Sequence, residues 1–180
     1  VDAGIVNGHY FANAFSVGLD ADIAAAANRM KKLPLMSGLR LYYSASLRQL
    51  LFGYQHCPWL SYRLDDSAQP EQATEHRYVL LAVTNGPTYG AGFRINPQAD
   101  HTDGHFDVCA ISYVPLVRAL KMLPVMQKGL HTTAPEAHFY RATKISITPR
   151  RPVNMQVDGE TMRVDHVDAQ ILPDALLVRV

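Results

Sequence analysis

The sequence has few cysteines and almost no net charge. Cys57 and Cys109 lie in unrelated segments without paired spacing, which favours buried thiols in a reducing compartment over a disulfide framework. Lys and Arg total 17 against 16 Asp and Glu, so the chain lacks the broad positive field that nucleic-acid binding requires. These two absences argue against a secreted disulfide scaffold and against nucleic acid as a partner.

Signals for secretion and membrane insertion are also absent. No apolar run approaches the roughly twenty residues that span a bilayer. Residues 1–4 contain neither a basic start nor an apolar stretch, so no signal peptide is visible. We therefore expect a cytoplasmic protein that contacts membranes only peripherally. Because the chain begins without Met, within an apparent strand, we also expect it to be part of a longer polypeptide.

The hydrophobic content is sufficient for a continuous core. The chain has 180 residues, which is about the size of one domain, and 48% of them are hydrophobic. Periodicity and capping residues predict a helix over 21–32 capped by Asp20, a second over 39–54, and a third opened by Pro115. We expect Pro124 to kink or end the third helix.

Strand signals outnumber the helices. Alternating or continuous apolar runs predict strands over 10–18, 60–64, 78–84, 106–113, 143–148, 153–157, 161–164, 169–172 and 176–180. They do not alternate regularly with helices, so a parallel βαβ arrangement is not expected. The prediction is an α+β, β-rich fold, mainly an antiparallel β-sandwich with about three helices.

A late Asp-Gly-Glu segment, residues 158–160, combines carboxylates with turn chemistry. It stands between alternating apolar residues, which is first of all the signal of a β-hairpin. On that interpretation Asp158 and Glu160 are turn carboxylates in contact with water. Composition alone does not single them out as catalytic.

A second polar segment runs from residue 100 to residue 105. Its Asp103-Gly104 pair is typical either of a solvated turn or of a hard-cation site, because calcium and magnesium prefer oxygen ligands. His101 and His105 stand four residues apart, a zinc-like spacing on a helix, but Gly104 argues against a helix here. The solvated turn, the cation site and the zinc site remain three alternatives.

Three motifs occur in a fixed order along the chain. Asn-x-x-Ser-x-Gly-x-Asp-Ala spans 13–21, Val-Asp-Gly-Glu spans 157–160, and between them 84–108 carries Asn-Gly, Tyr-Gly-Ala-Gly, Pro-x-Ala and Asp-Gly-x-Phe-Asp. Together they resemble the soluble diacylglycerol kinase and lipid kinase family, which also includes sphingosine and ceramide kinases. Ala91 stands where that family usually has a glycine. The resemblance covers nearly the whole chain.

The resemblance implies the second domain of the diacylglycerol kinase/NAD kinase-like fold, with residues 1–180 forming a C-terminal lipid-substrate domain. The family's Gly-Gly-Asp-Gly-Thr nucleotide loop does not occur in this sequence. ATP and the catalytic Mg²⁺ are therefore expected mainly from an N-terminal nucleotide-binding domain of the same polypeptide. The implied activity is phosphorylation of a lipid hydroxyl, such as that of diacylglycerol to give phosphatidic acid, and this fragment alone is expected to be inactive.

The resemblance also implies roles for single residues. Glu160 would accept the proton of the lipid hydroxyl, with Asp158 sharing or tuning that role. A structural Mg²⁺ would be held by a side-chain oxygen of Asp103 and mainly by the backbone carbonyls of Asp100 and His105. Such an ion would order the loop without acting on ATP.

Three further residues, Asn13, Asp20 and Asn85, lie in family motifs near the interdomain cleft. These residues either have a functional role at that cleft or act as helix caps and turn closures. Apolar residues of the second and third helices either line a lipid slot or simply pack in the core: Leu39, Tyr43, Leu47, Leu50, Tyr54, Leu116, Leu120, Met122, Leu123 and Met126. Arg118, Lys121 and Lys128 could face anionic headgroups.

The expected partners are a lipid substrate, a peripheral membrane surface and the nucleotide-binding domain, and a homodimer is left open. The alternative from another class is a non-catalytic lipid- or ligand-binding β-domain in which the Asp-Gly-Glu segment is only a turn.

Overall fold

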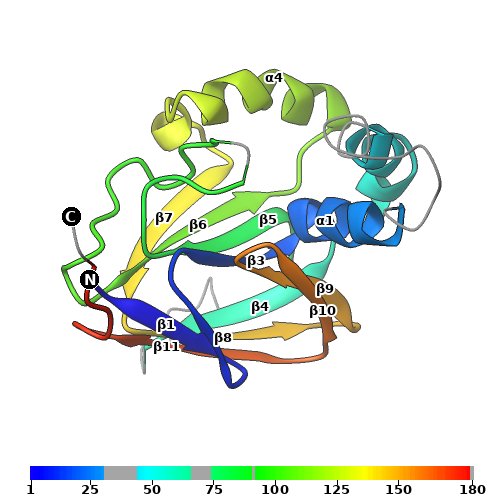
Figure 1. Ribbon diagram of the computed structural model, residues 1–180. Coiled ribbons are helices and arrows are strands. Elements are labelled where there is room, and N and C mark those ends of the chain that lie inside the picture. Colours follow the sequence, from blue (N-terminus) through cyan, green and yellow to red (C-terminus); the bar gives the residue numbers. More distant parts are fainter. Residues whose placement is uncertain (31–43, 66–73, 91, 179–180) are drawn as a thin grey trace.

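The computed structural model describes residues 1–30, 44–65, 74–90 and 92–178. Within them, eleven strands form one antiparallel sheet (Figure 1). The strands are β1 (Ala3–Val6), β2 (His9–Phe11), β3 (Ala14–Gly18), β4 (Trp59–Leu64), β5 (His76–Thr84), β6 (Phe106–Ser112), β7 (Ala137–Ala142), β8 (Lys144–Pro149), β9 (Val153–Val157), β10 (Glu160–Val164) and β11 (Val167–Leu172).

The sheet curls back on itself at β5. Its strand order is β10-β9-β3-β5-β4-β8-β11-β1-β2, and β6 and β7 continue from the other side of β5. The first residues of β5 pair with β4 (Trp59↔Arg77), whereas its later residues pair with β3 (Phe15↔Val83). The two halves of the sheet therefore face each other as two layers (Figure 1). The predicted β-rich, mainly antiparallel sandwich is confirmed.

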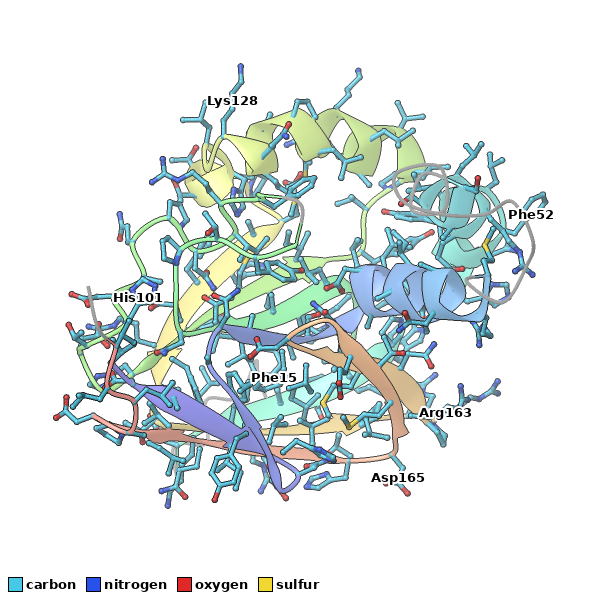
Figure 2. All side chains as sticks on the ribbon, in the orientation of Figure 1. Phe15, Phe52, His101, Lys128, Arg163 and Asp165 are labelled. Carbon is cyan, nitrogen blue, oxygen red and sulfur yellow. The ribbon has the colours of Figure 1, made fainter. Side chains whose placement is uncertain are left out.

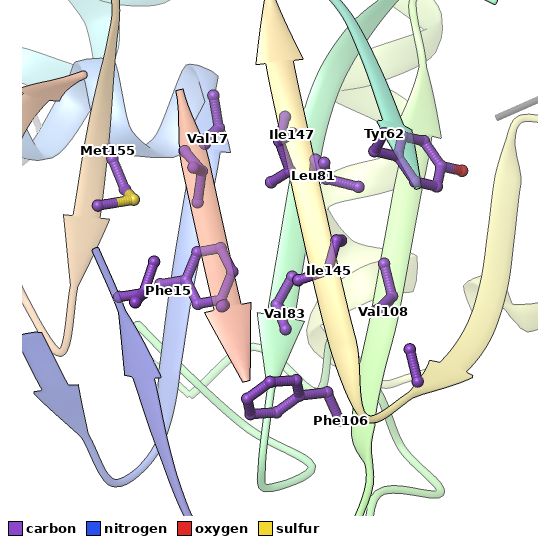
Figure 3. Close-up of a cluster of buried hydrophobic side chains, with 14 of the residues drawn as sticks. Phe15, Val17, Tyr62, Leu81, Val83, Phe106, Val108, Ile145, Ile147 and Met155 are labelled. Atoms are coloured by element: carbon purple, nitrogen blue, oxygen red, sulfur yellow. The ribbon is translucent and has the colours of Figure 1, made fainter. Parts of the chain in front are cut away.

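The main core lies between these two layers. Figure 3 shows side chains from both layers meeting there, including Phe15 of β3, Val83 of β5 and Ile145 of β8. Alternation along each strand sends these residues inward, and burying them supplies the main stabilising free energy of the sandwich.

A second apolar cluster covers the outer face of the layer that contains β5 and β6. Here Leu80 and Ile111 of the sheet pack with Met122 and Met126 of α4 (Leu116–Gln127). Further helical segments in the described residues are α1 (Leu19–Met30), an α-helical stretch at 44–48, the π-helix η1 (Gln49–Gly53) and the 3₁₀-helices η2 (Tyr54–His56) and η3 (His131–Thr133). Both α1 and α4 lie on this outer face, opposite the sandwich core (Figure 1).

The structure corrects two helix predictions. Asp20 lies inside the first turn of α1 and does not precede the helix as a cap. Pro124 does not end the third helix or divide it into two, because α4 continues to Gln127. Met122 and Met126, on either side of Pro124, are buried, and this burial offsets the hydrogen bond that proline cannot donate. Of the helix predicted over 39–54, residues 44–56 are helical and 39–43 lie outside the described residues.

The strand predictions need three corrections. The strand expected over 10–18 is divided into β2 and β3, with a break at residues 12–13. β7 was not predicted, whereas β1 agrees with the apparent strand at the start of the chain. Residues 176–178 form no strand, although Leu176 exchanges two backbone hydrogen bonds with Val1 (2.9 and 3.0 Å). Residues 179–180 lie outside the described part.

Candidate functional site

The Asp-Gly-Glu segment forms the tip of the β9–β10 hairpin. Asp158 and Gly159 both have positive φ, +44° and +92°, and the strands pair from Val157↔Glu160 onward. A two-residue turn with positive φ at both positions is the type that matches the twist of a hairpin, and Asp-Gly is among the sequences that favour it. The hairpin prediction is confirmed.

The Asp158 carboxylate holds this tip against the preceding strands. It accepts hydrogen bonds from the backbone N–H groups of Ala12 (2.8 Å), Asn13 (3.2 and 3.4 Å) and Ala14 (2.8 Å). The backbone N–H of Asp158 donates in turn to the Ala14 carbonyl (2.9 Å). These bonds cause the break between β2 and β3. They also engage both Asp158 oxygens in fixing the hairpin.

Glu160 is exposed, and its side chain makes no hydrogen bond or ion pair with another described residue. It pairs across the hairpin with Val157, whose side chain is buried in the sandwich core, whereas Gln156 lies on the opposite face, toward α1. Because directly paired residues share a face, the Glu160 side chain leaves the hairpin on the side of Val157, and at the tip of the hairpin it is exposed. It is free to meet a group that approaches the tip of the hairpin.

An apolar cavity of about 490 Å³ opens beside this hairpin. Its walls come from α1, α4, β5 and the loop around residue 90, and its floor is the outer face of the sheet. Gly159, directly before Glu160, contributes to the wall. The lining residues are mostly aliphatic or aromatic: Leu19, Ile23, Ala24, Ala27, Leu50, Val79, Leu80, Phe93, Ile95, Ile111, Val114, Ala119, Met122, Leu123 and Met126.

The predicted apolar stripes divide between this cavity and the surface. Leu50 and Leu123 line the cavity with Met122 and Met126, so part of each stripe faces it. Leu47, by contrast, is 59% exposed. Leu39 and Tyr43 lie outside the described residues.

One end of the cavity is polar and centres on Asp20. The Oδ2 atom of Asp20 accepts hydrogen bonds from the Ser16 hydroxyl and from the Tyr89 hydroxyl (2.8 Å), while Oδ1 is buried without a partner. Burial raises the pKa of the Asp20 carboxyl above its ordinary value, and the two hydroxyl donors only partly oppose this effect. A carboxyl group is thus placed at the wall of an otherwise apolar cavity.

The other two of the three motif residues, Asn13 and Asn85, join chain segments. Asn13 donates from Nδ2 to the Thr88 carbonyl (3.2 Å). Asn85 is buried and donates from Nδ2 to the carbonyls of Asp2 (2.7 Å) and Ala12 (3.2 Å). Both asparagines tie the β2–β3 connection to the loop after β5. These contacts are those of residues that close turns, one of the two roles considered for them from the sequence.

The loop from residue 100 to residue 105 is organised by short side-chain contacts. Asp100 Oδ1 accepts from the backbone N–H (3.0 Å) and hydroxyl (2.8 Å) of Thr102, and these bonds lower the pKa of the exposed Asp100 carboxyl. Asp103 accepts from the backbone N–H of His105 (3.0 Å) and from the Arg141 guanidinium. The side chains of Asp100, Asp103 and His105 therefore have local partners.

Sequence reasoning missed Asp2, which holds this loop in place. Asp2 is 1% exposed, and its carboxylate accepts from the backbone N–H groups of Gly104 (2.7 Å) and Asp174 (2.9 Å). Its backbone N–H donates to the His101 carbonyl (2.7 Å). An isolated aspartate about one hundred residues from its partner carries no local signal, so only the fold reveals this role.

Asp107, at the start of β6, is the unsatisfied acidic group beside the loop. Its Oδ2 atom is buried without a hydrogen bond, and burial, followed by the charge of Asp103, raises its pKa to about 6. A hard cation here would supply the positive charge that this oxygen lacks. The donor set of Asp103, Asp107 and nearby carbonyls therefore fits magnesium in chemistry, with Arg141 as a competing cation at Asp103.

No group of three His, Cys, Asp or Glu side chains converges on a metal-sized space within the described ranges. The structure thus provides no third side-chain ligand for a zinc ion at His101 and His105. The Mg²⁺ interpretation differs, because it needs fewer than three such side chains and relies otherwise on backbone carbonyls.

Across the described part of the chain, no helix is both long and apolar enough to cross a membrane.

Comparisons with known proteins agree with this architecture. A family model described as the YegS C-terminal NAD kinase beta sandwich-like domain matches residues 13–180. The diacylglycerol kinase of Mycobacterium tuberculosis is 27% identical over 169 residues, which cover 94% of this chain and 52% of that protein. The diacylglycerol kinase of Staphylococcus saprophyticus is 26% identical over 164 residues, covering 89% and 50%.

Solved structures show the same fold. A diacylglycerol kinase from Bacillus anthracis superposes with a TM-score of 0.61 at 15% sequence identity, covering 96% of this chain and 50% of that one. The chain therefore spans about half the length of the relatives it matches.

Proposed function

Because the chain belongs to the YegS C-terminal NAD kinase β-sandwich-like domain family, we propose that it is the lipid-substrate domain of an ATP-dependent lipid kinase. In this proposal a diacylglycerol-type lipid receives the phosphoryl group and becomes phosphatidic acid. An N-terminal nucleotide-binding domain of the same polypeptide supplies ATP and the catalytic Mg²⁺. The chain of 180 residues alone then has no kinase activity.

The observation that carries the proposal is the apolar cavity that reaches the tip of the β9–β10 hairpin. A cavity of about 490 Å³ lined by aliphatic and aromatic side chains has the size and polarity that suit an acyl chain. Gly159 forms part of its wall, so a lipid held there ends beside Glu160. A cavity built only as packing space would not need a free carboxylate at its rim.

Glu160 acts as the proton acceptor in this proposal. The lipid hydroxyl oxygen forms a bond to the γ-phosphorus of ATP, its proton passes to the Glu160 carboxylate, and ADP leaves with the electron pair of the broken P–O bond. Glu160 is exposed and unpaired among the described residues, which leaves both its oxygens available. Asp158 contributes indirectly, since its carboxylate fixes the hairpin that carries Glu160.

The loop from residue 100 to residue 107 is the proposed place for a structural Mg²⁺. Asp103 would offer a side-chain oxygen, and Asp100 and His105 mainly their backbone carbonyls. The unpartnered Asp107 Oδ2 supports a need for positive charge at this point. The ion would order the loop that Asp2 also anchors, and it takes no part in the proton transfer.

A membrane surface is the proposed source of the lipid. Apolar side chains project outward around the cavity from η1 and α4: Leu51 is 60% exposed, Phe52 68% and Val117 65%. Figure 2 shows Phe52 and Lys128, which directly follows α4, pointing away from the body of the protein. Exposed apolar residues together with exposed lysines fit an interface with anionic headgroups, where contact is peripheral.

The test is the effect of Glu160→Gln on phosphorylation of dioctanoylglycerol by the full-length protein. Removing a general base costs about 10²–10⁴-fold in turnover, so kcat should fall by at least about a hundredfold. Dioctanoylglycerol binding should remain, because Glu160 does not line the cavity. Glu75→Gln is the matched control, since Glu75 is paired with Arg150 and neither residue lines the cavity.

If Glu160→Gln turns over like the unmodified protein, Glu160 is not the base. The alternative of a non-catalytic lipid-binding β-domain would then be favoured, most strongly if the gene encodes no nucleotide-binding domain.

A further inference from the structure

Four side chains, from two strands, one helix and one loop, form the polar end of the cavity. Ser16 and Gln156 are paired neighbours on β3 and β9, and Ser16 donates its hydroxyl proton to Asp20 on α1. Tyr89 donates to the same Asp20 oxygen (2.8 Å) from the loop after β5. Asp20, Tyr89 and Gln156 all line the cavity. The strand register therefore gathers these polar groups at one place on the cavity wall.

Two of these groups have unused hydrogen-bonding capacity. Asp20 Oδ1 is buried and has no partner. The Gln156 residue is only 9% exposed, and its carboxamide makes no hydrogen bond with another described residue. Leaving a polar group unsatisfied and shielded from water carries a free-energy cost. A ligand that filled only the apolar part of the cavity would leave this cost in place.

We propose that Asp20 Oδ1 and the Gln156 carboxamide bind an uncharged oxygen group of the lipid, a hydroxyl or ester of its glycerol backbone. This inference rests on the proposed function and deepens it, because it assigns the polar contacts that orient the substrate. Asp20 and Gln156 are positioning residues for the lipid.

The location of these groups matches that role. Gln156 directly precedes Val157 on β9, and Val157 is the register partner of Glu160. The polar end of the cavity and the hairpin tip are therefore adjacent along the ribbon, roughly 5–7 Å apart between backbones. The Glu160 side chain leaves the ribbon on the opposite face from Gln156, so a glycerol backbone bound at Asp20 would extend past the hairpin tip to bring a neighbouring hydroxyl to Glu160, with its acyl chain along the apolar wall.

The surroundings favour an uncharged group over a cation. Among the described residues, no Lys, Arg or His lines the cavity, and the Asp20 carboxyl is shielded from water. Burial raises the pKa of Asp20, so its neutral form, which can donate as well as accept, is stabilised. A neutral carboxyl and a carboxamide are suited to an ester or hydroxyl oxygen, whereas an ammonium group would require an ionised carboxylate.

The experiment is equilibrium binding of radiolabelled dioctanoylglycerol to the 180-residue chain and its variants. Asp20→Leu keeps an apolar side chain of similar size but removes the hydrogen bonds, and the dissociation constant should rise about tenfold. Gln156→Met should weaken binding in the same direction, and Asp20→Asn should bind nearly as tightly as the unmodified chain. Asp168→Asn, at an exposed position of β11 outside the cavity, is the matched control and should leave binding unchanged.

Circular dichroism of each variant checks the fold, and Gln156→Met keeps the test valid if Asp20→Leu does not fold. Unchanged affinity in both variants would overturn the inference. So would sphingosine binding more tightly than dioctanoylglycerol and losing that binding in Asp20→Asn, since Asp20 would then be a site for a cation.

The inference and the proposed function can fail separately. If Asp20→Leu impairs binding but Glu160→Gln leaves phosphorylation intact, the subsite stands and the base assignment fails. If Asp20→Leu binds normally while Glu160→Gln abolishes turnover, the subsite is wrong and the kinase proposal stands.

Discussion

Replacing Asp158 should distinguish a role in fixing the hairpin from a role in accepting the proton of the lipid hydroxyl. Its carboxylate accepts from three backbone N–H groups, two of them at 2.8 Å. Hydrogen bonds to a charged group contribute about 1.5–3 kcal/mol each, but the bonds to Ala12 and Asn13 are exposed and the three are not additive. Asp158 also has φ of +44°, which alanine adopts at an additional cost. We expect Asp158→Ala to lower the free energy of unfolding by about 2–3 kcal/mol.

Asp158→Asn provides the comparison. Asparagine tolerates positive φ and keeps one acceptor oxygen, so the loss should be only about 1 kcal/mol. Urea unfolding followed by circular dichroism measures both changes, and the dependence on urea should keep the same slope. In the full-length protein Asp158→Ala should also lower kcat, because the hairpin that carries Glu160 is no longer fixed. A change below about 0.5 kcal/mol for Asp158→Ala would refute this account of the hairpin.

Three further predictions concern other parts of the molecule. Phe52→Ser should weaken binding to phosphatidylcholine–phosphatidylglycerol vesicles, measured by co-sedimentation, about tenfold because apolar area is lost. Tyr10→Ser, on β2, should leave this binding unchanged. Asp107→Asn, assayed in EDTA, should raise the free energy of unfolding at pH 7.5 by about 1 kcal/mol after allowance for solvent screening. Burial raises the pKa of Asp107 from 3.8 to about 6, so the free-energy cost of ionising Asp107 in the folded protein grows as pH rises through that window. The stability gained by Asp107→Asn should therefore disappear by about pH 4. A gain that stays constant with pH would contradict burial as the cause. Gly18→Ala should lower the melting temperature, since φ is +124° and a Cβ atom would stand 2.5 Å from the Val79 carbonyl oxygen; an unchanged value would show that β3 and β5 can separate at no cost.

The sequence predicted the elements whose signal is local. The Asp-Gly hairpin, the apolar strands β5 and β6, and the antiparallel β-rich class all follow from turn chemistry and side-chain periodicity. The motifs around residues 13, 84 and 157 identified the family, which the match over residues 13–180 confirms.

Features that depend on long-range contacts could not be predicted. Asp158 divides β2 from β3 through bonds across more than 140 residues, and Asp2 anchors a loop 102 residues away. The strand β7 has only Ala137 and Ala142 fully buried, so its apolar signal is weak. Asp20 was expected to cap a helix because Asp before an alanine run usually does. Its place on the cavity wall depends on Ser16 and Tyr89, which only the fold brings together.

The central claim is that the acyl chain of the lipid lies in the cavity between α1, α4 and the sheet. Photolabelling tests it most directly, with a diacylglycerol that carries a diazirine midway along one acyl chain, followed by peptide mass spectrometry. The account predicts crosslinks to cavity residues such as Ile23, Met122 and Met126, and their loss when unlabelled dioctanoylglycerol is in excess. Crosslinks confined to the exposed residues of η1 and α4, or to the opposite layer of the sandwich, would contradict it.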